Sequence, residues 1–189
     1  MSTGTIVLIV VGVLVILWII SMYNGLIRKK NDVENAFGGM DVQLKKRYDL
    51  IPNLISTVKQ YMTHERELLT KVTELRGKAM SGNVSTEEKV DIDNQITGAM
   101  KGIMVAVENY PDLKANTNFL NLQRTINEVE SQISAARRAY NATVTDFNNG
   151  VQMFPSSIMA GMMSLKTKKV FEIPDVERAN VNAEDLFNK

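Results

Sequence analysis

The chain has 189 residues, of which 22 are basic and 21 acidic, and it contains one histidine and no cysteine. The balanced charge provides no positive field of the kind that recruits nucleic acid. A chain without thiols has no disulfide framework, and it reports no redox compartment. Only 4 prolines and 11 glycines interrupt the sequence, a composition that favours long helices.

The N-terminal region is uncharged as far as residue 27, and residues 6–20 are almost entirely aliphatic. The stretch 5–23 is about 19 residues long, or roughly 28 Å of helix, which matches the hydrocarbon core of a bilayer. No basic residue precedes the run and no small-residue cleavage site follows it, so the pattern favours a retained anchor over a cleaved signal peptide. The predicted anchor residues, with two aromatic rings toward the interface, are Ile6, Leu14, Trp18 and Tyr23.

Basic residues flank this span on one side only. None occurs before it, whereas Arg28, Lys29 and Lys30 follow directly. The positive-inside rule counts such residues near a membrane segment and largely ignores acidic ones. The rule predicts an N-terminus outside the cell and a cytoplasmic remainder, with residues 1–27 as the membrane anchor.

Apolar residues recur at steps of three and four through most of the remaining chain, which is the pattern of amphipathic helices. The first such stripe can continue directly from the membrane helix. Ser85 and Glu88 form a capping-box pattern ahead of the third, and Pro155 follows the fourth. The predicted helices cover residues 26–44, 51–75, 85–110 and 116–151.

Four amphipathic helices with short connections bury their apolar faces most simply in an antiparallel up-and-down bundle. The sequence therefore predicts an all-α protein with a bundle over residues 28–155. Residues 156–189 are predicted to form a C-terminal apolar segment and a short extended tail. The one strand-like signal is the alternation of residues 169–173 ahead of Pro174.

Residues suited to catalysis or metal binding are scarce. His64 and Glu65 begin like the helix of a zinc metalloprotease, but the position four residues after the histidine is Leu68. A hydrolytic triad would need this lone histidine as its base, and no nucleophile-elbow pattern surrounds any serine. We therefore expect a protein that is not an enzyme, without catalytic residues, cofactor or metal.

Three consecutive basic residues, Lys45, Lys46 and Arg47, form the densest positive cluster. They can contact anionic lipid head groups if their helix returns to the membrane surface. Alternatively they lie at a solvated end of the bundle and pair with carboxylates such as Asp41 and Asp49. The pattern favours the solvated end, because charge runs usually mark exposed faces.

A helix boundary is predicted just after this cluster. Asp49 can accept hydrogen bonds from free amides, and Pro52 is tolerated in a first helical turn. Arg47, Asp49, Pro52 and Asn53 are therefore predicted to build a rigid structural corner between two helices. For Asn53 and Asn141, a hydrogen bond in the core and an exposed position both remain open.

The segment after Pro155 is uncharged and rich in methionine, and Lys166 follows it. At about eight residues the apolar run is too short to span a bilayer. It either caps its own bundle or contacts a neighbouring subunit or the membrane. The candidate oligomer or membrane contact residues are Ile158, Met159, Met162, Met163 and Leu165.

Several blocks of sequence resemble the LemA family, in the right order and over nearly the whole chain. The blocks are residues 41–54 (DVQLKKRYDLIPNL), 58–65, 110–116 (YPDLKAN), 135–141 (AARRAYN) and 154–155. The resemblance implies a bacterial single-pass membrane protein with an antiparallel helical domain and no established enzymatic activity or cofactor. Some members of that family are associated with magnetosome membrane formation, and others are encoded near candidate membrane peptidases.

The membrane anchor, the helical bundle and the resemblance to the LemA family together predict a scaffold in the bacterial cell membrane. We expect it to act through self-assembly and through contacts with lipids and proteins. The alternative is an accessory subunit that recruits or regulates a membrane-associated protease. The expected partners are membrane lipids, further copies of the chain and, in the alternative, that protease or another membrane protein. No nucleic-acid partner is expected.

Overall fold

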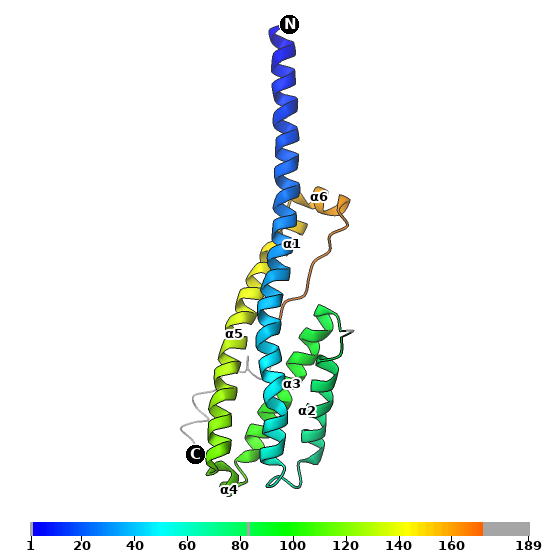
Figure 1. The fold of residues 1–189 in the computed structure, drawn as a ribbon. Helices are drawn as coiled ribbons and strands as arrows, with labels where there is room; N and C mark the ends of the chain where they lie inside the picture. Colours follow the sequence, from blue (N-terminus) through cyan, green and yellow to red (C-terminus); the bar gives the residue numbers. More distant parts are fainter. Residues whose placement is uncertain (1, 83, 172–189) are drawn as a thin grey trace, which may run out of the picture. The chain divides into compact units, whose positions relative to one another are not determined.

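The computed structural model describes residues 2–82 and 84–171. Over these residues the chain is helical and contains no strand, which confirms the all-α class (Figure 1). Residues 169–171 are not a strand, and the rest of the strand-like stretch and the predicted tail lie outside the described residues. The helices are α1 (Thr3–Val58), α2 (Arg66–Ala79), α3 (Thr86–Val107), α4 (Pro111–Lys114), α5 (Thr117–Gln152) and α6 (Ser156–Met162).

Helix α1 runs for 56 residues from the apolar N-terminal stretch to Val58, with Pro52 inside it. The predicted boundary at Asp49 and Pro52 is therefore wrong. A proline within a helix cannot donate to the carbonyl four residues earlier, here that of Tyr48. This carbonyl instead accepts a hydrogen bond from Nε of Arg76 on α2, at 2.7 Å. Because the orphaned acceptor has a partner, the helix continues past the proline.

The predicted helix over residues 51–75 is divided in two. Its first part is the end of α1, and its second part belongs to α2. The connection 59–65 is not helical, although Met62 within it is buried like the helical members of the same apolar stripe. The apolar spacing therefore continues through this connection, and the sequence pattern does not indicate the break between α1 and α2.

The other predicted helices agree more closely with the structure. Ser85 and Glu88 form the capping box at the start of α3, with both reciprocal hydrogen bonds present. The side chain of Asn116 caps α5 by accepting from the backbone amides of Asn118 and Phe119. Helix α5 ends at Gln152, close to the end predicted from the following Phe-Pro pair.

The chain divides into two compact units, and both long helices contribute to each. The first unit contains residues 1–43 and 132–170. In it α1 and α5 are antiparallel, since Lys29 forms an ion pair with Asp146 while Phe37, further along α1, stacks edge-on against Tyr140, earlier in α5. The ring centroids of that aromatic pair are 5.9 Å apart.

The second unit contains residues 44–131 and Phe171. Within it, the end of α1, then α2, α3 and the start of α5 alternate in direction, as an up-and-down bundle does (Figure 1). The apolar residues of these segments form its core. The predicted domain boundaries after residues 27 and 155 stay predictions.

Candidate functional site

The N-terminal part of α1 exposes its apolar side chains on all sides. An 18-residue window of this helix is 0% buried, and α1 is the one helix among the described residues that is long and apolar enough to cross a membrane. The predicted anchor residues Ile6, Leu14, Trp18 and Tyr23 are all exposed. Such a helix is compatible with a single-pass membrane protein.

The end of the apolar run is held against α5 within the first unit. A Cβ atom at Gly150 would lie 3.2 Å from both Leu26 Cδ2 and Lys29 Cδ, so α5 approaches α1 closely at this level. Lys29 also pairs with Asp146, one turn earlier on α5. The last turns of α5 therefore lie beside the residues where α1 changes from apolar to charged.

A buried polar cluster occupies the core of the second unit. The side chains of Arg47 and Asp93 are both 0% exposed, and they form an ion pair. Arg47 Nη1 also donates to Thr97 Oγ1 at 2.9 Å and to Glu130 Oε1 at 3.1 Å. This cluster joins α1, α3 and α5 at one level.

The position of Arg47 corrects the interpretation of the basic cluster. Lys45 and Lys46 are exposed, as expected of a solvated face, but Arg47 points into the core. It occupies the same side of α1 as Met40 and Leu54, seven residues before and after it, both of which are fully buried. A buried, ion-paired guanidinium is suited to fixing the register of three helices.

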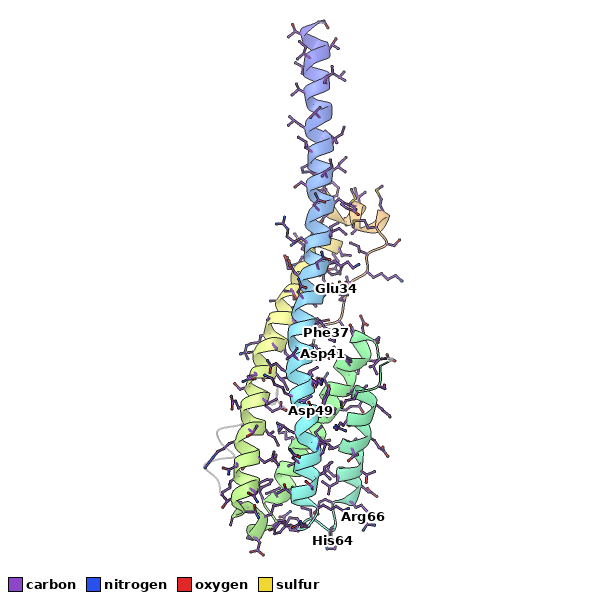
Figure 2. All side chains as sticks on the ribbon, in the orientation of Figure 1. Glu34, Phe37, Asp41, Asp49, His64 and Arg66 are labelled. Atoms are coloured by element: carbon purple, nitrogen blue, oxygen red, sulfur yellow. The ribbon has the colours of Figure 1, made fainter. Side chains whose placement is uncertain are left out.

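The four residues of the predicted corner do not form a common site. Arg47 is buried, whereas Asp49, Pro52 and Asn53 are exposed on α1, where Asp49 is labelled in Figure 2. The prediction of a corner is wrong, because α1 is unbroken at this point. For Asn53 the exposed alternative holds, while Asn141 is half-buried.

The connections at one end of the second unit are joined by side-chain hydrogen bonds. Tyr110 Oη donates to Glu65 Oε2 at 2.7 Å, and Asn116 Nδ2 donates to Tyr61 Oη at 3.2 Å. The hydrogen bond to the Glu65 carboxylate raises the pKa of Tyr110 above its ordinary value. These bonds tie the α1–α2 connection to the residues on either side of α4.

The lone histidine, His64, is exposed in that α1–α2 connection (Figure 2). Throughout residues 2–82 and 84–171, no three His, Cys, Asp or Glu side chains are grouped so that they could hold a metal ion. A groove beside this connection has apolar walls from Ile55, Met62 and Leu69 and basic residues Lys59 and Arg66 at its lining. The groove is partly open and is not an enclosed cavity.

The methionine-rich segment forms α6 and the turn after it. Its candidate contact residues divide into two groups by exposure. Ile158 and Met162 are exposed, whereas Met159, Met163 and Leu165 are half-buried. Phe154, just before this helix, is 81% exposed, although no local sequence pattern marks it as a surface residue.

Comparisons with known proteins agree with the blocks of sequence described above. The sequence profile of the LemA family matches residues 36–184. Protein LemA of Metamycoplasma hominis is 28% identical over 165 residues, which cover 87% of this chain and 75% of that protein. Magnetosome protein MamQ 2 of Paramagnetospirillum magneticum is 19% identical over 175 residues, covering 79% of this chain and 64% of the relative.

Magnetosome protein MamQ of Magnetospirillum gryphiswaldense is 17% identical over 174 residues, with the same shares of the two chains covered. The chain thus spans less than two thirds of the length of the magnetosome relatives. The profile match extends over most of the helical part of the chain and includes the buried Arg47 and the capped start of α5. The chain therefore belongs to the LemA family.

Proposed function

We propose that this protein is a single-pass membrane scaffold that acts by assembling with further copies of itself and by contacting lipids and proteins. One observation carries the proposal: the apolar anchor and the helical core share the single uninterrupted helix α1. When anchors associate side by side in the bilayer, the parts of α1 that continue from them are then brought together as well. A flexible linker would allow no such coupling.

Confinement to a membrane supports the self-assembly part of the proposal. Two-dimensional confinement raises the effective concentration of like molecules, so weak lateral contacts suffice for association. The relatives named as magnetosome proteins support a role at a membrane. None of the relatives' names denotes an enzyme, which supports a function through contacts.

The proposed orientation places the N-terminus outside the cell and the helical units in the cytoplasm. Because the chain has no native cysteine, single thiols can be introduced at chosen positions. A thiol at Ser2→Cys should react with a membrane-impermeant maleimide on intact cells. A thiol at Ser134→Cys, an exposed position on α5, should react only after the cells are opened. The reverse pattern would contradict this orientation.

The self-assembly is tested by the mass of the full-length protein in mild detergent and in nanodiscs, measured over a wide concentration range. A scaffold should form a homo-oligomer without any added partner. A monomer at every concentration would contradict the scaffold proposal and favour the accessory-subunit alternative. That alternative is favoured by the open groove near Met62, which offers apolar walls and two cations to a protein partner.

The groove can be tested with a matched pair of variants. Arg66 lines the groove, and Arg124 is an exposed arginine on α5 outside it. If a partner binds the groove, Arg66→Glu should weaken co-purification of membrane proteins with the full-length chain, and Arg124→Glu should not. Equal effects of both substitutions would show that general surface charge, and not the groove, governs partner binding.

A further inference from the structure

The turn before α6 and α6 itself expose one apolar stripe. Ile158 and Met162 lie four residues apart on α6 and are 62% and 78% exposed, and Phe154 in the turn before α6 is 81% exposed. We call these three residues the apolar stripe. Ala160, on the other side of the helix, is 1% exposed. The short helix is therefore two-faced, with its small residue packed inward and its large apolar side chains in solvent.

This exposed stripe is anchored at both ends to the same part of the first unit. Before it, Gly150 packs against Leu26 and Lys29 of α1. After it, the amide of Asn148 clamps the backbone of Lys168, donating to its carbonyl at 2.9 Å and accepting from its amide at 2.8 Å. Since both connections are fixed on the last turns of α5, α6 is held near the end of the apolar run of α1.

The level of the stripe along α1 follows from helix geometry. Helix α5 is antiparallel to α1, so residues after Gly150 continue toward the apolar part of α1. Helix α5 ends at Gln152, two residues after Gly150, which is a rise of about 3 Å, and Tyr23 comes three residues before Leu26, a rise of about 4.5 Å. The turn that carries Phe154 therefore begins near the level of Tyr23, at the interfacial end of the predicted span.

The charge pattern around the stripe fits a lipid surface. No charged residue occurs between positions 147 and 165, and Lys166, Lys168 and Lys169 follow immediately. Apolar side chains that enter the boundary of head groups and acyl chains, with cations beside them, are typical of interfacial helices. Lysines near an anionic leaflet strengthen such binding.

The area of the stripe argues against a second copy as its main occupant. Three side chains on one short helix and the turn before it present only a few hundred Å² of apolar surface. A stable protein interface buries about 800 Å² on each partner. Contact with a lipid leaflet has no such minimum area, because each apolar side chain removed from water contributes independently.

We propose that α6 is an interfacial membrane element, with Phe154, Ile158 and Met162 embedded in the leaflet at which α1 leaves the bilayer. This inference rests on the membrane anchoring in the proposed function and goes beyond it by assigning a lipid-binding surface to residues outside the anchor. Such a contact fixes the rotation of α1 about its own axis relative to the leaflet. It gives the protein a second, peripheral hold on the membrane.

The test uses full-length protein carrying an environment-sensitive fluorophore on Met162→Cys, in nanodiscs of phosphatidylcholine and phosphatidylglycerol with one protein copy per disc. We expect blue-shifted emission and quenching by nitroxide-labelled phospholipids. The matched control is Ala139→Cys, an exposed position of the same unit on α5. It lies 11 residues before Gly150, about 16 Å along the helix, and should show neither effect.

A second variant separates lipid contact from an effect of the label. Ile158→Glu places a charge on the stripe, so the quenching at position 162 should fall while circular dichroism stays unchanged. Water-like emission without quenching at position 162, and likewise for a label on Ile158→Cys, would overturn the inference. A blue shift that requires two copies per disc and lacks lipid quenching would also overturn it, because the occupant would then be a second copy. Single-copy discs make the result independent of self-assembly.

Discussion

Replacing Arg47 by methionine tests the buried polar cluster. Met40 and Leu54, the neighbours of Arg47 at seven-residue spacing on α1, are fully buried, so a methionine suits the position in shape and polarity. The substitution leaves the carboxylate of Asp93 in the core without its guanidinium partner. Breaking a buried pair by removing one partner costs about 3–5 kcal/mol, because the remaining charge is uncompensated.

The same structure predicts a different result when both partners are removed. Asp93 lies on the buried side of α3 with Val90 and Ile96, so the double variant Arg47→Met with Asp93→Leu replaces the pair by apolar contacts. Such replacements of whole buried pairs are often neutral or stabilising. The double variant should therefore recover most of the lost stability. Glu130→Gln should cost at most about 1 kcal/mol, because the Glu130 side chain is 31% exposed and screened by solvent.

The assay is denaturant unfolding of the full-length protein in detergent, followed by circular dichroism. The free energies of the two single variants and the double variant form a double-mutant cycle, which isolates the coupling between Arg47 and Asp93. Lys46→Met is the matched control, since Lys46 is the exposed neighbour and should change stability by no more than about 0.5 kcal/mol. If Arg47→Met unfolds like Lys46→Met, the assignment of Arg47 to the core is refuted.

Three further predictions concern helix ends and helix continuity. Ser85→Ala should lower stability near neutral pH by about 1 kcal/mol, measured by thermal melting, because it removes the cap of α3. Hydrogen bonds from Ser85 lower the pKa of Glu88 below the ordinary value of 4.5. The contribution of Glu88 to the free energy of unfolding should therefore be complete above pH 4.5 and be lost as the pH falls through the lowered pKa. This loss of stability in acid should be smaller in Ser85→Ala. Arg76→Ala should destabilise the protein by about 1–3 kcal/mol in chemical denaturation, because it removes the hydrogen bond that Arg76 donates to the Tyr48 carbonyl. An unchanged denaturation midpoint would contradict the explanation given for the proline within α1. Asp49→Ala should leave the melting temperature nearly unchanged, because α1 continues through this position and Asp49 caps no helix. A marked decrease in the melting temperature would contradict this.

Local sequence signals predicted the features that depend on local chemistry. The apolar N-terminal run, the capping box at Ser85 and the end of α5 ahead of Phe154 and Pro155 all follow from residues that are neighbours in sequence. The long stripe of α5 was equally clear, because its spacing is sustained over 36 residues.

The errors arose where a distant residue changes the local outcome. Pro52 and Asp49 together resemble a helix start. A hydrogen bond from Arg76, 28 residues after Tyr48, satisfies the Tyr48 carbonyl that the proline cannot reach. Nothing in the sequence around Pro52 indicates this partner.

Arg47 was misread for a related reason. Its two lysine neighbours suggested a solvated patch, whereas its seven-residue spacing from Met40 and Leu54 already indicated the core side of α1. The spacing was the available signal. The identity of its acidic partner, Asp93, depends on the packing of α3 and was not accessible from local pattern.

The central claim, a scaffold whose copies associate through their anchors, can be measured directly in cell membranes. Single cysteines placed in turn along the apolar part of α1 should form oxidative cross-links between copies, since the native chain supplies no competing thiol. Association through one helix face predicts cross-linked dimers that recur about every 3.5 residues. Cross-linking at no position would contradict the claim, as would weak cross-linking of equal strength at every position.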